Sequence, residues 1–473
     1  MKMMIGRRQL YRLLPGKRKY ILFLAVVVLF LGCEKWIDPE INVNPDQPAD
    51  VTMETLLAYM EADVAFKLAG GMEIILSQSV LLQQLDGVDR QMLGLSNYII
   101  NPNDLVWIWA DAYSEILMDA KVLREKAATL GSPYNAGVSD IITAFTLGQL
   151  TDAWGKIPWK ESLQGSANTQ PAYDDQESVY QSIQGLLDRA IDSLSAPADP
   201  YGIKGDYIYD GDRLKWLQAA HALKARYYIH LSNRNGEQAY LDALEEVQEA
   251  FSAVEDDMLF AFGTGESESN PIYQFMRDRN DVRMGNFYIE MLKAGNDPRL
   301  AVFALPDNDG NFTGSMPGQA NGAASKPGPA VAAADAPTYV ITYTELLFIK
   351  AEAMFITGYE ENEVKIVLLE AVSASLDQFG TVDTDWLESY SGQIMDLTGD
   401  ALFAEIMTQK YIATFCQPEA YHSWRRTGYP VLTPNPNGAT NEIPTRFPYP
   451  ISELVYNQNV PTGVSVTDRV WWD

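Results

Sequence analysis

Cysteine and histidine are scarce in this chain, and each shortage excludes a class of site. Only Cys33 and Cys416 occur among 473 residues, which is too few for a disulfide framework or a cysteine-based metal cluster. The three histidines, His221, His230 and His422, show neither HExxH spacing nor another zinc pattern. We therefore expect the histidines to have packing or surface roles, and we expect no metal and no cofactor.

Enzyme motifs are also missing. The sequence contains no G-x-S-x-G, no G-x-G-x-x-G after a strand pattern and no P-loop motif, so hydrolase, dinucleotide and nucleotide-triphosphate functions lack support. Residues 307–311 (DNDGN) resemble the start of a calcium-binding loop, but the acidic residue that ends such a loop is missing. We therefore expect a plain turn there. One enzymatic alternative stays open: among 63 acidic residues some pair always lies at a separation suited to glycoside hydrolysis.

Basic residues are few and unevenly placed. Against 63 acidic residues there are 35 basic ones, for a net charge of −28, and seven of the basic residues precede residue 20. Without that segment 28 basic residues remain, and the charge is −35. Such a surface repels phosphate backbones and anionic lipids, so we expect no nucleic-acid partner.

Apolar and aromatic residues are plentiful. The chain is 47% hydrophobic and contains 10 Trp, 25 Tyr and 17 Phe, which suits a large packed core and excludes intrinsic disorder. Its length allows more than one domain, but a single helical or repeat domain can also be this long. We expect one large domain at 51–473.

The N-terminus has the pattern of a bacterial lipoprotein. The basic segment leads into eleven apolar residues at 21–31, too few to span a membrane but typical of a secretory signal. Gly32 and Cys33 follow as in a lipobox, although Phe30 departs from the usual aliphatic residue. We expect a signal peptide at 1–32, lipidation of Cys33 and a polar, proline-containing tether at 33–50. The alternative is an uncleaved membrane anchor.

Apolar residues recur at helical spacing through most of the remaining chain. From Asp212 to Leu231 they return at steps of three and four, which predicts one buried helix face. Strand-like alternation is scarce. We expect helices at 52–68, 103–130, 138–152, 174–194, 212–231, 237–253, 286–294, 343–357, 361–379 and 400–416.

The segment at 343–357 predicts how these helices are arranged. Its apolar residues lie on two faces, and a helix covered on both sides belongs inside a stack of helix pairs. Because no strict 34-residue repeat is present, any tetratricopeptide-like units must be irregular. Two stretches, 258–285 and 310–337, interrupt the helices, and loops of this length are commonly functional or mobile.

Four sequence segments together identify a family resemblance. They are QLTDAWGKIPWKE at 149–161, DRLKW at 212–216 with LKARY at 223–227, YTELLFIKAEA at 343–353, and a fourth with PEAY at 418–421, WRRTGYP at 424–430 and PTRFPYP at 444–450. In this order they resemble the SusD/RagB family of outer-membrane nutrient-uptake lipoproteins, in particular the branch with an Asp-x-Trp-Gly-x-Ile-Pro motif. Each motif is weak alone, but the combination is specific. Tyr421 departs from the branch, which commonly has Trp there.

The resemblance implies an all-α fold in which tetratricopeptide-like helix pairs, an α-solenoid scaffold, support an irregular loop-rich subdomain. It implies a lipid-anchored protein on the outer face of the outer membrane that covers a SusC-like TonB-dependent barrel. Such proteins bind an oligosaccharide or a peptide and help to deliver it, and they are not enzymes. The competing hypothesis is a secreted all-helical glycosidase or lyase with paired carboxylates.

The matched motifs themselves are expected to be scaffold. Trp154 and Trp159 suit a packed turn at a helix end. Arg425 and Arg426 are expected to pair with acidic residues of neighbouring helices. The spacing of Glu345, Lys350 and Glu352 is that of a solvated or helix-pairing face.

The family tends to line its ligand site with one segment from the first third of the chain and one from the middle. Here both segments mix aromatic rings with amide and guanidinium donors, the combination that sugars require. The arginines of the middle segment can bind carboxylates, or they can pair with nearby acidic residues. The candidate ligand-binding residues are Arg90, Asn97, Tyr98, Asn101, Trp107, Tyr273, Arg277, Asn280 and Arg283, with Tyr98 and Tyr273 as the favoured aromatics.

Overall fold

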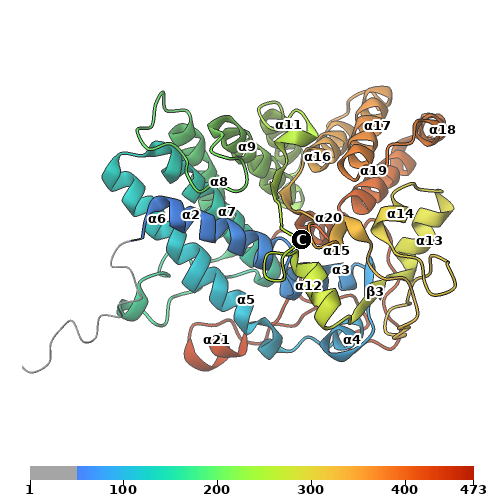
Figure 1. The fold of residues 1–473 in the computed structure, drawn as a ribbon, viewed down its shortest axis with the longest axis horizontal. Coiled ribbons are helices and arrows are strands. Elements are labelled where there is room, and N and C mark those ends of the chain that lie inside the picture. The colour runs from blue at the N-terminus through green and yellow to red at the C-terminus, as the bar shows by residue number, and fades with distance from the viewer. Residues whose placement is uncertain (1–50) are drawn as a thin grey trace, which may run out of the picture. The chain divides into compact units, whose positions relative to one another are not determined.

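The computed structural model describes residues 51–473, and within these residues helices predominate (Figure 1). The expected signal peptide (1–32), lipidation site Cys33 and tether (33–50) lie outside the described residues. The longer helices are α2 (Met53–Asp63), α6 (Leu117–Leu130), α7 (Pro133–Trp154), α8 (Gln176–Leu194), α9 (Arg213–His230), α11 (Glu237–Val247), α16 (Tyr343–Ile356), α17 (Glu361–Gln378), α18 (Thr384–Met395), α19 (Gly399–Ala413) and α20 (Pro418–Thr427).

Consecutive long helices pack against one another as pairs. Contacts run from α6 to α7, to α8, to α9 and to α11, and continue through α16 to α17 and α19. This array, visible along the upper and left parts of Figure 1, confirms the expected all-α fold with irregular tetratricopeptide-like helix pairs.

Local sequence signals explain where these helices begin and end. The Asp212 carboxylate accepts hydrogen bonds from the backbone N–H groups of Leu214 and Lys215, which caps α9 at its predicted start. Thr342 caps α16 in the same way. Helix α6 ends at Gly131, whose φ of 73° places it in the left-handed region that terminates helices.

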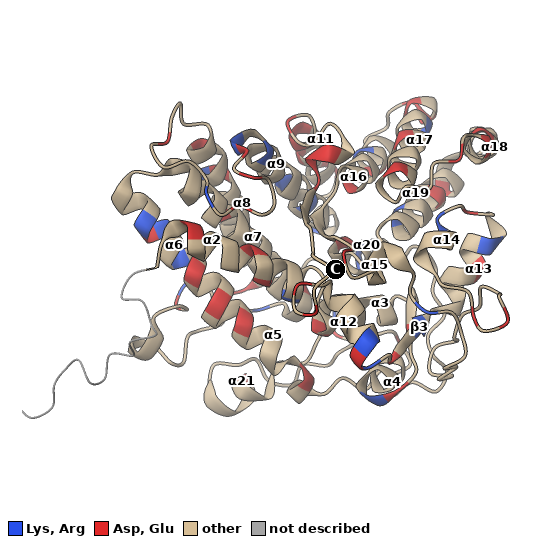
Figure 2. Cartoon of the chain, viewed as in Figure 1, with Lys and Arg blue, Asp and Glu red and all other residues tan. Residues whose placement is uncertain are grey.

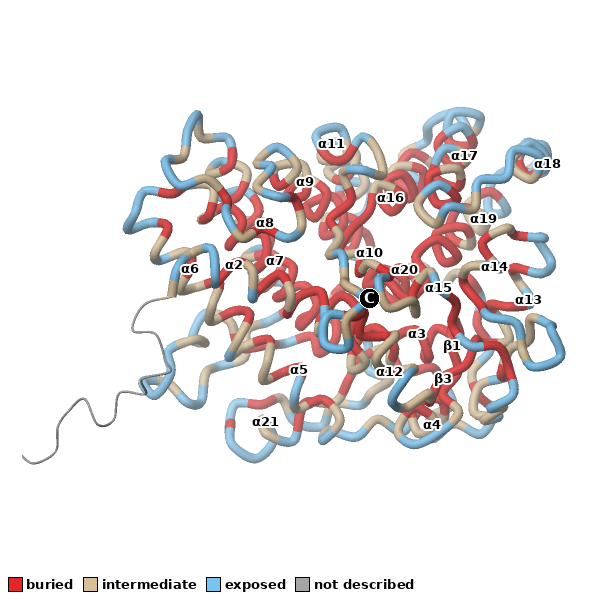
Figure 3. Tube along the Cα trace, viewed as in Figure 1, coloured by how far each residue is buried: buried red, intermediate tan, exposed pale blue. Residues whose placement is uncertain are grey.

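Two helices are buried almost all round, as Figure 3 shows by their red traces. Nearly every residue of α7 from Gly137 to Trp154 is buried. Helix α16 is buried from Thr344 to Ile349 and again from Ala351 to Met354. The prediction that the segment at 343–357 is covered on both sides is therefore confirmed.

The remaining chain forms the irregular, loop-rich part. Its strands make two antiparallel pairs, β1 with β3 and β2 with β4. The strands are β1 (Leu85–Gly87), β2 (Met258–Phe260), β3 (Val282–Met284) and β4 (Thr338–Ile341). The shorter helices are α3 (Ser77–Leu81), α4 (Arg90–Ser96), α5 (Val106–Asp111), α10 (Ser232–Asn235), α12 (Pro271–Asp278), α13 (Asn286–Ala294), α14 (Leu300–Phe303), α15 (Pro329–Ala332) and α21 (Ile451–Tyr456), with π-helical turns at Val64–Leu68, Met72–Leu76 and Ala112–Ile116 and 3-10 turns at Pro102–Leu105, Gly165–Ala167 and Val254–Asp256.

Two of the longer helices, α18 and α20, lie outside the ranges expected from the sequence, and so do the short helices α3, α4, α10, α12, α14, α15 and α21. Helix α18 has only a narrow apolar face, because Tyr390 and Ile394 are its only buried residues. Helix α20 buries mainly polar and charged residues, whose stability depends on distant partners. Apolar periodicity detects neither kind. The stretch 258–285, expected to interrupt the helices, also contains β2, α12 and β3.

The segment Met53–Leu81 is long and apolar enough to cross a membrane. However, 72% of its most apolar window is buried inside the protein. Helix α2 packs against α6 and α7. The segment therefore has the burial of a core element.

Candidate functional site

Strands β1 and β3 bring together the two segments expected to line the ligand site. They pair in an antiparallel register in which Asp86 lies opposite Arg283. The early segment continues from β1 into α4, and the middle segment runs from α12 into β3. The two segments, about 190 residues apart in sequence, therefore meet at one junction.

Ion pairs hold this junction closed. Arg90 donates from Nε to the Asp281 carboxylate over 2.9 Å and from Nη2 to the carbonyl oxygen of Arg279 over 2.5 Å. Arg279 contacts Asp281 over 2.8 Å and also donates to Gln91. Because Asp281 is fully buried, its charge needs partners of opposite sign, and the two arginines provide them. The alternative that the arginines of the middle segment pair with nearby acidic residues thus holds for Arg279, which binds Asp281, and for Arg277, which binds Asp278.

Left-handed backbone conformations gather at the junction. Gln83, Arg90, Tyr98 and Asn280 all have φ between 46° and 60°. For residues with a side chain this conformation costs about 1 kcal/mol or more each, and such strain is concentrated at functional sites. The surrounding contacts must compensate for this cost, so the backbone conformation of the junction is fixed by its tertiary contacts.

Two of the candidate ligand-binding residues lie in the interior. Tyr98 is only 4% exposed, and its hydroxyl accepts a hydrogen bond from the backbone N–H of Asn435. Arg283 is also buried and donates to the carbonyl oxygens of Gly322, Asn280 and Val282. The expectation that Tyr98 offers a ring face is wrong in this structure, because the ring packs under the loop that carries Asn435.

The other candidate residues are accessible to different degrees. Trp107 on α5 is 71% exposed, and Tyr273 on α12 is partly exposed. Asn97 accepts a hydrogen bond from the Asn435 side chain over 3.2 Å. Arg277 and Asn101 are exposed, and Asn280 contacts Arg283.

A cavity of about 460 Å³ opens beside the junction. Gln83 lies just before β1, and Asn286 and Phe287 lie just after β3. Two further loops complete the wall. The lining residues are Gln83, Asn286, Phe287, Met316, Pro317, Gly318, Gln319, Thr433, Pro434, Asn435, Pro436 and Asn437.

This lining contains no charged side chain and combines amides with an aromatic ring. Amide groups can donate and accept hydrogen bonds with sugar hydroxyls, and the Phe287 ring offers an apolar face. We refer to it as the amide cavity. Its volume lies within the usual range for a small-molecule site.

None of the ligand-binding residues expected from the sequence lines the amide cavity. Residues 316–319 belong to the stretch 310–337 that was expected to be functional or mobile, but 433–437 carried no signal beyond a run of proline and asparagine. Asp86 accepts hydrogen bonds from the hydroxyls of Ser96 and Ser315, and the Asn435 side chain donates to the Ser96 carbonyl oxygen, so the two loops are linked to the same segment. Burial raises the pKa of Asp86, although these hydrogen bonds oppose the shift.

The stretch at 307–311 is a turn around one carboxylate, as expected. Asp307 accepts hydrogen bonds from the backbone N–H groups of Asp309 and Asn311 and from the Thr313 hydroxyl. These hydrogen bonds lower the pKa of Asp307. The carboxylate is thus occupied by its own loop.

Among the described residues, Asp152, His230 and His422 form a buried group of potential metal ligands. Their spacing in the sequence gives no indication that these residues meet. The ring nitrogens of His230 are engaged with the Tyr180 hydroxyl at 2.8 Å and with Glu419 at 2.7 Å. A metal ion here would have to displace one of these partners.

The Asp152 carboxylate is similarly engaged. Its Oδ1 atom accepts hydrogen bonds from the Tyr180 hydroxyl over 2.5 Å and from the Trp472 indole over 2.7 Å. We interpret the group as a hydrogen-bonded core network that ties the C-terminus to α7 and α9. The expectation of packing roles fits His230 and His422, which are fully buried.

The acidic residues of the matched motif on α16 belong to the scaffold. Glu345 and Glu352 are buried on α16 and bind Arg226 and Arg426 respectively. The solvated-face reading is therefore wrong for these two glutamates, and the helix-pairing reading is confirmed. Arg425 behaves differently, because it donates mainly to the carbonyl oxygens of Asp152 and Thr445.

Comparisons with known proteins agree with this architecture. A SusD/RagB family protein from Bacteroides thetaiotaomicron is 24% identical, with a TM-score of 0.79 over 89% of this chain and 99% of its own. A chitin-binding protein is 23% identical, with a TM-score of 0.77 over 89% of this chain and all of its own. A chitin-binding SusD homolog from Flavobacterium johnsoniae is 20% identical, with a TM-score of 0.75 over 89% and 98%.

No curated protein matches the chain. At the identities above, the solved structures establish the fold alone. The sequence of residues 45–450 matches the family described as "Starch-binding associating with outer membrane". This match spans most of the chain, and the chain therefore belongs to the SusD-like family.

Proposed function

We propose that this protein is a cell-surface lipoprotein that captures an oligosaccharide and passes it to a SusC-like TonB-dependent barrel. In this proposal a lipid on Cys33 anchors it to the outer membrane, and the amide cavity with the adjoining junction binds the ligand. The protein is a binding component without catalytic function.

The uncharged lining of the amide cavity is the observation that supports a sugar as the ligand. An uncharged lining of amides and one aromatic ring suits a neutral sugar chain better than the charged termini of a peptide. The names of two similar structures mention chitin, and the family description mentions starch, which supports a glycan as the ligand class.

The junction residues supply a rigid support for this cavity. Asp86, Asp281 and Asn435 are buried and hydrogen-bonded. Rigid walls lower the entropy lost on binding. Among the candidate residues, Tyr273, Trp107 and Asn101 remain as accessible groups that can extend contacts along a longer chain.

Binding is tested by calorimetry with chitin oligomers and maltooligosaccharides. The variants Phe287→Ala and Gln319→Ala should weaken binding at least several-fold, because each removes one kind of sugar contact. Tyr359→Ala, which truncates an exposed aromatic residue in the turn between α16 and α17, is the matched control. Unchanged affinity in Phe287→Ala would refute the assignment of the amide cavity as the ligand site.

The same mixtures test the absence of catalysis. The proposal predicts that the oligosaccharide is recovered intact after prolonged incubation, as judged by mass spectrometry. Cleavage that survives purification and is lost on neutralising a carboxylate pair would favour the glycosidase alternative.

The partner is tested by immunoprecipitation from outer membranes. An antibody is preferable to a C-terminal tag, because Trp472 is buried and Asp473 lies beside Arg425. Wild type should enrich a large barrel, whereas Cys33→Ala should lose membrane association. Recovery of the lipidated protein without a barrel would refute the importer assignment.

A further inference from the structure

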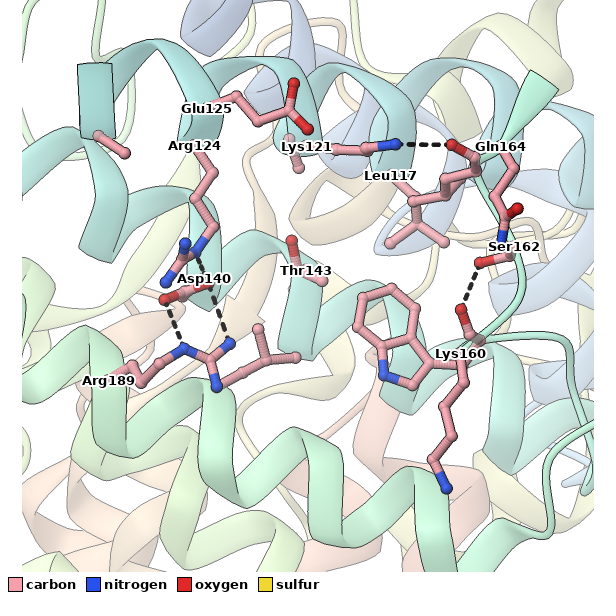
Figure 4. Close-up of a pocket in the computed structure, with 15 residues that line it drawn as sticks. Leu117, Lys121, Arg124, Glu125, Asp140, Thr143, Lys160, Ser162, Gln164 and Arg189 are labelled. Carbon is pink, nitrogen blue, oxygen red and sulfur yellow. Dashed lines mark hydrogen bonds and ion pairs between the residues drawn. The ribbon is translucent and has the colours of Figure 1, made fainter. Parts of the chain in front are cut away.

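A second cavity, of about 820 Å³, lies in the helical array among α6, α7 and α8. The loop after Trp159 closes one side of it (Figure 4). We refer to it as the basic cavity. None of the residues predicted from the sequence to bind a ligand lines it.

The charge of the basic cavity is opposite to that of the protein. Its ionisable lining comprises Lys121, Arg124, Lys160 and Arg189 against Glu125 and Asp140. The chain as a whole carries a formal charge of −28. Figure 2 shows the basic residues along α6 that contribute to this exception.

Two arginines from different helices share one buried carboxylate. Arg124 on α6 donates from Nε to Asp140 on α7 over 2.7 Å. Arg189 on α8 lies 3.4 Å from the same carboxylate. Asp140 is fully buried, whereas the arginine side chains are 40% and 50% exposed. One negative charge therefore fixes the position of two positive charges at the cavity wall.

The arginines keep donors free for a ligand. In the part of the chain that the structure describes, the two terminal nitrogens of Arg124 make no hydrogen bond. Arg189 donates to the Gly185 carbonyl oxygen over 3.1 Å and to Asp140 over 3.5 Å, and each of these terminal nitrogens carries a second N–H group. A guanidinium fork of this kind matches a carboxylate in a bidentate manner.

Lys121 and Trp159 add a further charge and an apolar surface. The Lys121 ammonium group donates to the carbonyl oxygen of Leu163 over 2.7 Å, a partner that leaves its charge uncompensated (Figure 4). Trp159 is partly exposed and lines the same cavity. An indole ring suits the apolar face of a sugar ring.

We propose that the basic cavity binds a carboxylate-bearing oligosaccharide, with the carboxylate held by Arg124, Arg189 and Lys121 and a sugar ring against Trp159. The preference for a carboxylate follows from the cavity, while the choice of a sugar as its carrier rests on the proposed function. The site is separate from the amide cavity, which suits neutral chains.

Long-range electrostatics cannot account for such binding. The negative surface of the protein repels an anion at a distance, so the short-range contacts with the arginines must provide the affinity. The carboxylate itself, rather than the size of the sugar, is therefore the decisive group.

The test is calorimetry of the full chain with trigalacturonate and with its methyl-esterified, uncharged form. Wild type should bind the acid at least ten-fold more tightly than the ester. Lys121→Gln and the charge-balanced double variant Arg124→Gln with Asp140→Asn should each weaken binding of the acid about ten-fold. Thermal unfolding verifies that each variant is folded.

Two controls separate this site from the amide cavity. Arg234→Gln, which removes an exposed arginine bound to the Trp471 carbonyl, should leave binding of the acid unchanged. Phe287→Ala should also leave it unchanged while weakening neutral oligosaccharides. Loss of acid binding in Phe287→Ala would overturn the inference and leave the proposed function intact.

Three further results would refute binding of an acidic oligosaccharide in the basic cavity. Equal affinity for the acid and the ester, or undetectable binding of the acid by wild type, would overturn the proposal. Binding of triglutamate without binding of trigalacturonate would show that the cavity takes an acidic peptide and would overturn the assignment to a sugar.

Discussion

The imidazole of His230 on α9 lies 2.7 Å from the Glu419 carboxylate on α20, across 189 residues of sequence. Burial lowers the pKa of His230, but Glu419 and Asp152 more than offset this effect, and the net pKa is raised. The ring of His230 stacks on Trp472 at a centroid distance of 5.1 Å. This contact helps to hold the C-terminus in the core.

Two neighbouring histidines should therefore titrate in opposite directions. The rings of His230 and His422 lie 5.5 Å apart. Burial lowers the pKa of His422 to about 3. Nitrogen-15 NMR should find His422 neutral at pH 5 and His230 still protonated at pH values where a free imidazole has lost its proton. With only three histidines, His221→Gln assigns the third signal. A protonated His422 at pH 5 would contradict the network.

Glu61 should make the protein less stable as the pH rises. Burial and the Asp206 charge raise the pKa of Glu61 to about 10. Between the unfolded value of 4.5 and about 10, the folded state holds a proton that the unfolded state has lost, so the free energy of unfolding falls by about 1.4 kcal/mol per pH unit. Glu61→Gln should reduce the slope measured by urea unfolding at pH 6 and 8 by about this amount, while buried groups such as Asp257, whose pKa is raised to about 8, still contribute. The exposed Glu388→Gln should keep the wild-type slope, and an equal slope in Glu61→Gln and wild type would refute the assignment.

Gly148 should be required where α7 crosses α9. A Cβ atom added at Gly148 would lie 2.2 Å from the Tyr227 hydroxyl oxygen and 2.5 Å from the adjacent ring carbon. Gly148→Ala should therefore destabilise the protein by about 1–3 kcal/mol through overpacking. Gly185 on α8 is the matched control, because nothing lies within 4 Å of its added Cβ. Gly185→Ala should be neutral or stabilising by up to about 1 kcal/mol, and equal effects of the two changes would rule out the steric explanation.

The buried pair of Arg426 and Glu352 should be costly to break and cheap to replace. Arg426 donates from Nη2 to Glu352 over 2.7 Å, and both side chains are buried. Arg426→Met alone should cost about 3–5 kcal/mol, because it leaves Glu352 charged and buried. The double change to methionine should cost clearly less than the sum of the single changes. Denaturant unfolding of the four proteins measures the coupling, and strict additivity would exclude it.

Local sequence information accounts for most of the scaffold. The apolar spacing of α9 and α16 predicted these two helices and that α16 is covered on both sides, and in the structure Asp212 and Thr342 cap their first turns. These properties depend on neighbours within one or two helical turns, so they can be read from the sequence. The failure at α20 has the opposite reason, because its buried arginines and Glu419 are stable only beside partners from distant helices.

The candidate site also combines features that local sequence predicts with features that depend on tertiary contacts. The sequence by itself determined that two segments, around Arg90 and around Arg277, carry sugar-binding residue types and that the chain has the motifs of its family. Only the tertiary structure decided that β1 pairs with β3, that Tyr98 is buried, and that 316–319 and 433–437 complete an uncharged cavity. It alone also gathered Arg124, Asp140 and Arg189 from three helices. Strand register and helix packing set such contacts between residues far apart in sequence, and local periodicity carries no record of them.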